Sequence, residues 1–218
     1  MKKVLLSMTL ISFISVATFA QNARFGITAG VSLASMKAKE NGISITSDGK
    51  VGLTVGVLAD VSVAENFTFQ PGVNFTQKGS KFSMSDAGGS IESTQTLNYL
   101  ELPLNFIYNA PAGNGKFFAG LGPVLGYGMS GKAKSKITGE PEESGDIKFG
   151  SNEVEDHYKP FEFAGNLLAG YELSNGFFVA ANYNMGLSNI AIGSDSDNSS
   201  LKNRYFGIKF GYKFGSKK

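Results

Sequence analysis

The sequence predicts an all-β fold, an eight-stranded antiparallel up-and-down transmembrane β-barrel. Eight segments alternate apolar with small or polar residues at a period of two, which is the spacing of side chains along a strand. The connections between these segments are alternately long and short, as in barrels of the outer membrane. An export leader precedes the first segment, which places the chain outside the cytoplasm.

The first 20 residues have the pattern of a cleavable signal peptide. Lys2 and Lys3 give a positive start, and residues 4–16 form a mostly apolar run of 13 residues followed by small residues. That run is too short to cross a bilayer as a helix. We therefore expect a signal peptide over residues 1–20 and one outer-membrane β-barrel domain over residues 21–218.

Composition excludes several other classes of protein. Two of the 20 basic residues lie in the leader, so 18 Lys and Arg face 18 Asp and Glu in the mature chain, which is formally neutral. Without a basic excess, nucleic acid is not an expected partner. The chain has no Cys and so no disulfides. Its 28 Gly, 18 Phe and 8 Tyr suit strands and turns better than helices.

Eight strands follow from the alternation. The clearest is the hairpin Tyr99–Met129, whose arms set large apolar residues on one face, with a turn rich in Pro, Gly and Asn between them. The eight segments cover residues 24–37, 51–63, 67–78, 99–108, 117–129, 160–173, 177–190 and 202–214. Polar linkers at 38–50, 79–96, 131–159 and 191–201 alternate with short turns at 64–66, 109–115 and 174–176.

The two faces of these strands decide between a membrane barrel and a soluble one. Val57 and Leu102 represent the large apolar face, which we assign to lipid. The other face is a nearly continuous set of Gly, Ser, Thr and Asn. A soluble lipocalin-like barrel also has eight strands, but this small polar face could not form its apolar ligand cup.

Several motifs resemble one family. The strand Tyr99–Leu104 is similar to the Tyr-Leu-Glu-(Ile/Leu)-Pro-Leu strand of the PorT-like outer-membrane β-barrel proteins common in Bacteroidetes. Gly120–Tyr127 and Gly186–Ile190 are similar to the same family's pattern. The resemblance covers Phe25–Phe214 and implies the barrel fold, while the named member assists a secretion and gliding apparatus. The family usually closes on a terminal aromatic residue, whereas here Gly-Ser-Lys-Lys follows Phe214.

Charged residues on the small face are expected to form a structural polar network inside the lumen. Eight strands leave an interior just wide enough for side chains, and charges in such a space persist only when they are paired. Counted from the short-turn rim, Asp60, Glu101 and Lys209 are predicted to form one network, and Lys78 with Glu162 a second. Arg204 shares a face with Phe206 and is expected to point outward.

The loops offer no strong catalytic or metal-binding pattern. The one His, His157, lies on the longest linker beside Glu153, Glu155 and Asp156. An enzyme site needs a nucleophile, a base and an orienting group together, and the regular spacing of an EF-hand is missing. We expect a solvated loop here and likewise at residues 195–198, with no catalytic, cofactor or metal site.

The sequence therefore predicts a small protein of the cell outer membrane in a Gram-negative envelope. Its expected role is structural or in surface interaction through four extracellular loops, including assistance to envelope or secretion machinery. A narrow channel for small solutes is the alternative, and an outer-membrane enzyme is the least favoured class. The expected partners are outer-membrane lipid, the barrel assembly machinery, and an extracellular ligand or envelope protein.

Overall fold

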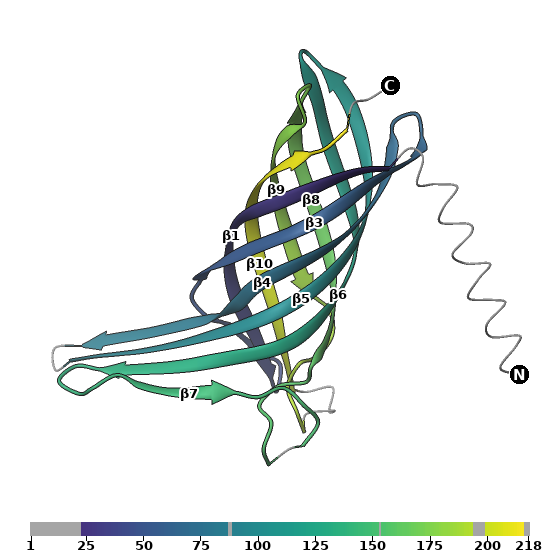
Figure 1. Cartoon of the computed structure of the whole chain (residues 1–218). Coiled ribbons are helices and arrows are strands. Elements are labelled where there is room, and N and C mark those ends of the chain that lie inside the picture. Colours follow the sequence, from purple (N-terminus) through teal and green to yellow (C-terminus); the bar gives the residue numbers. More distant parts are fainter. Residues whose placement is uncertain (1–22, 87–88, 153, 194–198, 216–218) are drawn as a thin grey trace, which may run out of the picture.

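A ring of eight antiparallel strands forms the body of the protein (Figure 1). The computed structural model describes residues 23–86, 89–152, 154–193 and 199–215, so the predicted signal peptide lies outside the described residues. The ring contains β1 (Ala23–Glu40), β3 (Lys50–Ala64), β4 (Phe67–Asp86), β5 (Gly89–Ala112), β6 (Gly115–Ile137), β8 (Phe161–Leu173), β9 (Phe177–Gly186) and β10 (Ser199–Lys213).

The ring closes between the first and the last strand. β1 pairs with β10 in continuous antiparallel register from Gly26 opposite Lys213 to Glu40 opposite Ser199. Each ring strand is thus paired on both sides, which satisfies backbone groups that lipid could not hydrogen-bond. No helix of the described residues is long and apolar enough to cross a membrane. The predicted fold class, an eight-stranded barrel of the outer-membrane type, is confirmed.

The predicted facing of the strands is also confirmed. Large apolar side chains cover the outside of the ring; the side chain of Val57 is 54% exposed and that of Leu102 is 39% exposed. The opposite face is buried inside the ring and carries most of the buried Asn, Thr, Asp, Glu and Lys residues. This arrangement is that of a barrel whose solvent outside is lipid.

Three connections are short, as predicted, although β5 continues to Ala112 and leaves only residues 113 and 114 of the turn expected at 109–115. Three of the long connections are not simple loops, because they contain strands. Tight turns join β3 to β4, β5 to β6, and β8 to β9. The expected linker at 79–96 is instead the far end of a long hairpin formed by β4 and β5, with Lys78 opposite Leu97 and Ser85 opposite Ser90. β6 likewise continues to Ile137. Large apolar residues stand at only a few positions in these stretches, such as Phe82, Met84 and Ile91, while the backbone pairing persists.

Two short strands extend this outer region. β2 (Ile43–Thr46) pairs with the end of β1 through the Asn41-Gly42 turn, in which both residues have positive φ angles of 48° and 85°. β7 (Glu143–Ile147) pairs with the end of β6. Figure 1 shows the ends of β4, β5 and β6, with β7 alongside, projecting away from the ring. We call this part the extracellular sheet.

A β-bulge marks the base of the extracellular sheet. The register between β5 and β6 shifts where Asn98 opposes Ser130 and Tyr99 opposes Gly128, which leaves Met129 as an extra residue. A bulge changes which face the following residues occupy. Tyr127 therefore points outward, whereas Gly131 lies against the side chains of Leu97 and Ile147.

The predicted seventh strand was four residues too long. β9 ends at Gly186 rather than at residue 190. The next two amides, of Leu187 and Ser188, bond to the carbonyl of Phe163 at 2.8 and 3.1 Å, and Ile190 turns into the barrel mouth, where it is fully buried. The chain thus leaves the sheet to close the extracellular opening.

We expect a charge on the outer face of the ring to destabilise the barrel. Val57→Lys and Leu102→Lys should each lower the free energy of unfolding by about 2–4 kcal/mol near the bilayer midplane. The measurement is equilibrium unfolding in lipid vesicles. Ile45→Lys is the control, because Ile45 is 68% exposed on β2 beyond the ring, and it should change the value by about 0.5 kcal/mol or less. Equal effects at all three positions would contradict the assigned faces.

Candidate functional site: the polar lumen and its two ionic clusters

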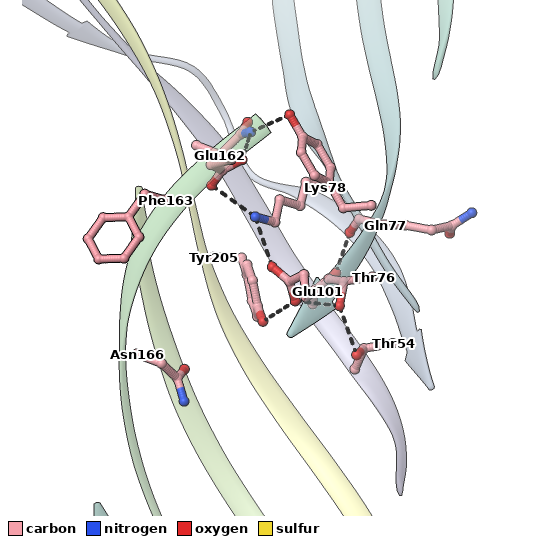
Figure 2. A network of polar contacts seen from close by, with 12 residues as sticks. Thr54, Thr76, Gln77, Lys78, Glu101, Glu162, Phe163, Asn166 and Tyr205 are labelled. Atoms are coloured by element: carbon pink, nitrogen blue, oxygen red, sulfur yellow. Dashed lines mark hydrogen bonds and ion pairs between the residues drawn. The ribbon is translucent and has the colours of Figure 1, made fainter. Parts of the chain in front are cut away.

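An ionic cluster fills the extracellular half of the lumen. Lys78 of β4 lies between Glu101 of β5 and Glu162 of β8, and its Nζ is 2.9 Å from the Oε1 atom of each (Figure 2). All three side chains are only 1% exposed. The Lys78 Nζ also lies 4.6 Å from the ring centroid of Tyr99. We call Lys78, Glu101 and Glu162 the upper cluster.

Neutral donors complete the coordination of the two carboxylates. The Tyr205 and Thr76 hydroxyls donate to Glu101 Oε2 at 3.0 and 2.7 Å. The Asn203 amide donates to Glu162 Oε2 at 2.7 Å. Buried ions are tolerated only when their remaining hydrogen-bonding capacity is used in this way. The upper cluster and its donors thus link β4, β5, β8 and β10 to one another across the lumen.

A second ionic cluster lies at the rim with the short turns. Lys213 Nζ is 2.7 Å from Asp60 Oδ2 and 3.0 Å from Glu172 Oε2. Lys116 Nζ is 3.3 Å from Glu172 Oε2, and Arg24 pairs with Glu172 Oε1 and, at 3.7 Å, with Asp60 Oδ2. We call Arg24, Asp60, Lys116, Glu172 and Lys213 the lower cluster.

The structure corrects the predicted grouping of charges. All five predicted residues face the lumen, and the predicted pair of Lys78 with Glu162 is confirmed. Glu101, however, belongs with that pair, and Asp60 belongs to the lower cluster. Among the described residues, Lys209 has no carboxylate within ion-pair distance. The predicted network of Asp60, Glu101 and Lys209 was therefore wrong in its Asp60 member, whereas Lys209 and Glu101 are close enough to interact electrostatically.

Lys209 was grouped with Asp60 because the prediction did not include the stagger of the strands. Across β1, Gly30 pairs with both Lys209 and Thr54, so Lys209 lies level with Thr54 and six residues from Asp60 along β3. Lys213 instead pairs with Gly26, whose other partner is Leu58. A count from the turn rim ignores this offset, which strand tilt imposes on every barrel.

Arg24 and Lys116 of the lower cluster were not among the predicted lumen residues, although the alternation along their strands places them on the inward face. Arg24 alternates with the inward Gly26, and Lys116 with the inward Phe118, so each points into the lumen. Both lie near the ends of strands, where the alternation is short. Only the register shows that they meet Glu172.

Apolar layers separate these polar groups along the lumen. Ile107, Phe118, Phe178 and Ala180 pack together between the two clusters. At the extracellular mouth, a second layer contains Met36, Leu97, Tyr99, Ile147 and Ile190. The lumen is therefore filled in alternating polar and apolar levels rather than lined by one continuous polar surface.

A small cavity remains between the upper cluster and the inner apolar layer. Its volume is about 50 Å³, and its polar wall includes Lys209, Asn74, Asn105, Asn166 and Asn182. Asn182 donates to Asn166, which donates to Asn105, both at 3.0 Å. Polar walls and this size suit a few water molecules, which would solvate the Lys209 amine.

The long loop before β8 lies over the extracellular mouth. The rings of Phe149 and Tyr99 meet edge to face at 5.5 Å, and the Tyr158 hydroxyl donates to Gln95 Oε1 at 2.6 Å. Burial raises the pKa of Tyr158, so this phenol remains a neutral donor. The loop thus acts as a cover for the lumen.

The acidic loop residues form local hydrogen bonds. His157 Nδ1 accepts from the Lys148 amide at 3.2 Å, and Asp156 Oδ2 accepts from the Asn152 amide at 3.0 Å. Glu153 and residues 195–198 lie outside the described residues. In the part of the chain that is described, no group of three His, Cys, Asp or Glu side chains could hold a metal ion.

Comparison with known proteins agrees with this architecture. A family model for the outer membrane protein β-barrel domain matches residues 19–191. The chain belongs to this family. Membership places it in the outer membrane, in contact with lipid, as the sequence predicted.

Several solved structures are similar to the chain. Neisserial surface protein A shares 14% identity at a TM-score of 0.45, and Ail, the attachment invasion locus protein of Yersinia pestis, shares 16% at 0.40; each match covers 88% of this chain and 99% of that one. The N-terminal barrel domain of Pseudomonas aeruginosa OprF shares 10% at 0.31, covering 85% and 97%. No curated protein matches the chain significantly.

We expect Lys78 to be the most important single charge for stability. Lys78→Met leaves two buried carboxylates unpaired and should lower the free energy of unfolding by about 3–5 kcal/mol. Adding Glu101→Gln and Glu162→Gln to this variant should recover part of the loss. Equilibrium unfolding in vesicles measures both effects.

Lys209→Met is the matched control, because it also removes a lumen amine but breaks no direct ion pair among the described residues. Its cost should be clearly smaller. A loss as large as that of Lys78→Met would contradict the special importance of the upper cluster, because Lys209 would then stabilise the interior equally.

Proposed function

We propose that this protein is a non-conducting outer-membrane barrel that acts through its extracellular surface. The observation that carries the proposal is the filled lumen, in which two ionic clusters alternate with two apolar layers. Apolar layers exclude hydrated ions, and the charged groups of the upper cluster are buried and bonded to one another and to neighbouring side chains. A narrow channel therefore gains no support from the interior.

The extracellular sheet supports a role in surface interaction. Met84, Ile91 and Ile137 are direct cross-strand neighbours on β4, β5 and β6, and they are 59%, 46% and 39% exposed. Phe82 lies two residues from Met84 and is also exposed. Apolar groups gathered in water, outside the lipid-facing band, are typical of interaction sites.

The other face of the same sheet is charged and keeps it soluble. Lys81 pairs with Glu92 at 2.8 Å, and Lys134 pairs with Glu142 at 2.7 Å. Exposed pairs contribute little to stability. Their role is to make one face of the sheet polar, which leaves the apolar face as the distinctive surface.

We further propose that this role lies in the envelope or its secretion machinery and that it involves no catalysis. The resemblance of Tyr99–Leu104 to the PorT-like strand supports the first part. For insertion, the barrel assembly machinery is the proposed partner. Phe214 supports this, because it is 48% exposed directly after β10 and its ring meets Tyr212 at 5.1 Å.

The purified barrel should form no steady pore in planar bilayers. Lys78→Met, combined with Glu101→Gln and Glu162→Gln, should also remain closed, because both apolar layers stay in place. A stable, ion-selective conductance in the unmodified protein would overturn the proposal and favour the channel.

The surface role is tested in cells. Met84→Ser with Ile91→Ser and Ile137→Ser should leave the amount of folded barrel unchanged but reproduce the defect of a deletion strain in envelope integrity, secretion or surface binding. Lys81→Ser with Lys134→Ser on the opposite face is the control. If the apolar triple variant behaves like the unmodified strain while deletion has a phenotype, the apolar face is not the working surface.

A further inference from the structure

The outer face of the barrel changes from apolar to basic along the seam that closes the ring. β1 and β10 lie side by side at this seam (Figure 1). Toward the rim with the long connections, the outward cross-strand pairs are in turn Val31 with Ile208, Leu33 with Phe206, Ser35 with Arg204, and Lys37 with Lys202. Leu33 and Phe206 are 51% and 46% exposed, as expected of residues that face lipid. Arg204 is therefore the first charged residue beyond the lipid-facing band at this seam.

The basic residues lie at the depth of the lipid headgroups. Two residues advance a strand by about 7 Å, or about 5 Å along the membrane normal at a tilt near 40°. Arg204 is thus about 5 Å, and the pair of Lys37 and Lys202 about 10 Å, beyond the last lipid-facing pair. The polar layer of a bilayer is about 5–7 Å deep on each side. In an outer-membrane barrel the rim with the long connections faces the exterior, so this layer belongs to the outer leaflet.

Lys37 and Lys202 bring two like charges together. They are direct cross-strand partners on the outward face, where Cβ atoms are about 4.5–5.5 Å apart. Like charges in this position destabilise a sheet. Glu40 cannot relieve the repulsion from β1, because alternation places it on the opposite face. The direct opposition of the two amines, rather than a count of charges in the region, is what an anion between them would relieve.

Arg204 is held beside this pair of amines. Its Nη2 donates to Thr46 Oγ1 of β2 at 3.4 Å, and Thr46 is the second cross-strand partner of Lys37. Because β1 lies between β10 and β2, the Arg204 side chain must cross the outer face of β1 to reach Thr46. The guanidinium therefore lies close to Lys37.

Apolar surface continues directly below these cations. Met185 of β9 is the cross-strand partner of Arg204 on the side away from β1, and it is 50% exposed on the lipid-facing side. The aliphatic part of an Arg side chain packs on such a surface while its charged end stays in the polar layer. A ligand that combines acyl chains with an anionic head would match both parts of this surface.

Phosphate is the anion that suits the three donors. A phosphate group offers three strong acceptor oxygens and up to two negative charges, so it can accept from two amines and a guanidinium at once. Arg also binds phosphate through two parallel hydrogen bonds, and Lys binds it as a point charge.

We infer that Lys37, Lys202 and Arg204 form a binding site for the phosphate of an outer-leaflet lipid headgroup. The acyl chains of the lipid lie below, on Leu33, Phe206 and Met185. A phosphate bound there connects β10 to β1 across the seam that closes the ring. The inference does not depend on the proposed surface role, since it concerns the lipid around the barrel and not the apolar face of the extracellular sheet.

The test uses the refolded barrel in maltoside micelles, which carry no phosphate. Backbone NMR shifts are followed by residue during titration with diphosphoryl lipid A, with dephosphorylated lipid A and with inorganic phosphate. Saturable shifts at Ser35, Lys37, Lys202 and Arg204 are expected with diphosphoryl lipid A, and binding of the dephosphorylated form should be at least tenfold weaker. Equal binding of both forms, an equal response to inorganic phosphate, or no saturable shift at these residues would each overturn the inference.

Variants identify the charges that bind. Lys37→Gln combined with Lys202→Gln should weaken binding of diphosphoryl lipid A at least tenfold, whereas Lys37→Arg with Lys202→Arg should retain it. Lys132→Gln with Lys136→Gln is the matched control, because it removes the same charge from β6, three strands from β10 in the ring, and it should bind normally. Heat-dependent gel migration checks that each variant is folded. An equal loss in the control would indicate general surface attraction and overturn the site.

The single change Lys37→Gln gives a second readout, which also decides the case if the double variant fails to fold. In maltoside alone it should raise the temperature at which the barrel unfolds, because it removes the repulsion from Lys202. With saturating diphosphoryl lipid A the same variant should unfold below the unmodified protein, because a ligand that binds only the folded state stabilises it in proportion to its affinity. A variant that is less stable in both conditions would contradict the opposition of charges.

Discussion

Closure of the backbone hydrogen bonds is the constraint on which the rest of the structure depends. Lipid offers no partner for an exposed amide or carbonyl, so β1 must pair with β10 as well as with β3. With eight strands, closure leaves an interior that only side chains can fill. That narrow interior explains why the lumen contains paired charges, apolar layers and the hydrogen-bonded amides of Asn105, Asn166 and Asn182.

The narrow interior also explains why the polar groups are arranged in clusters. A lumen charge with neither a charged partner nor water would be severely destabilising. Lys78 instead pairs with Glu101 and Glu162, and Tyr205 and Asn203 donate hydrogen bonds to these two carboxylates. The interior therefore serves stability. Its composition leaves the two ends of the barrel, where water is present, as the surfaces that can recognise other molecules.

The sequence predicted the fold and the facing of residues well because both depend on a local period of two. Val57 and Leu102 outside, and Lys78 and Glu162 inside, needed only alternation. The pairing of charges depends instead on the register between strands. The prediction placed Lys209 with Asp60, because the stagger of β10 against β1 and β3 cannot be obtained by counting residues along one strand.

The strands of the extracellular sheet were not predicted, for a different reason. Between residues 79 and 96 the only large apolar residues of the sequence are Phe82, Met84 and Ile91, so the alternation is too short to predict strands over the whole stretch. The strands there are defined by pairing with neighbours, such as Lys81 opposite Thr94, which a sequence pattern does not contain. The bulge at Met129 also reverses the parity of the following residues on β6.

The lower cluster has a consequence for how the barrel folds. Asp60 and Lys213 are separated by 153 residues in the chain, and Arg24 and Glu172 by 148. Contacts between such distant parts form only after a large loss of chain entropy, so topologies rich in them fold slowly. These ion pairs connect the first two ring strands to the last part of the chain, and they form only when the ring is complete. The lower cluster thus stabilises the closed ring and not its precursors. In a partly assembled chain that still lacks β10, Asp60 has no Lys213 to pair with.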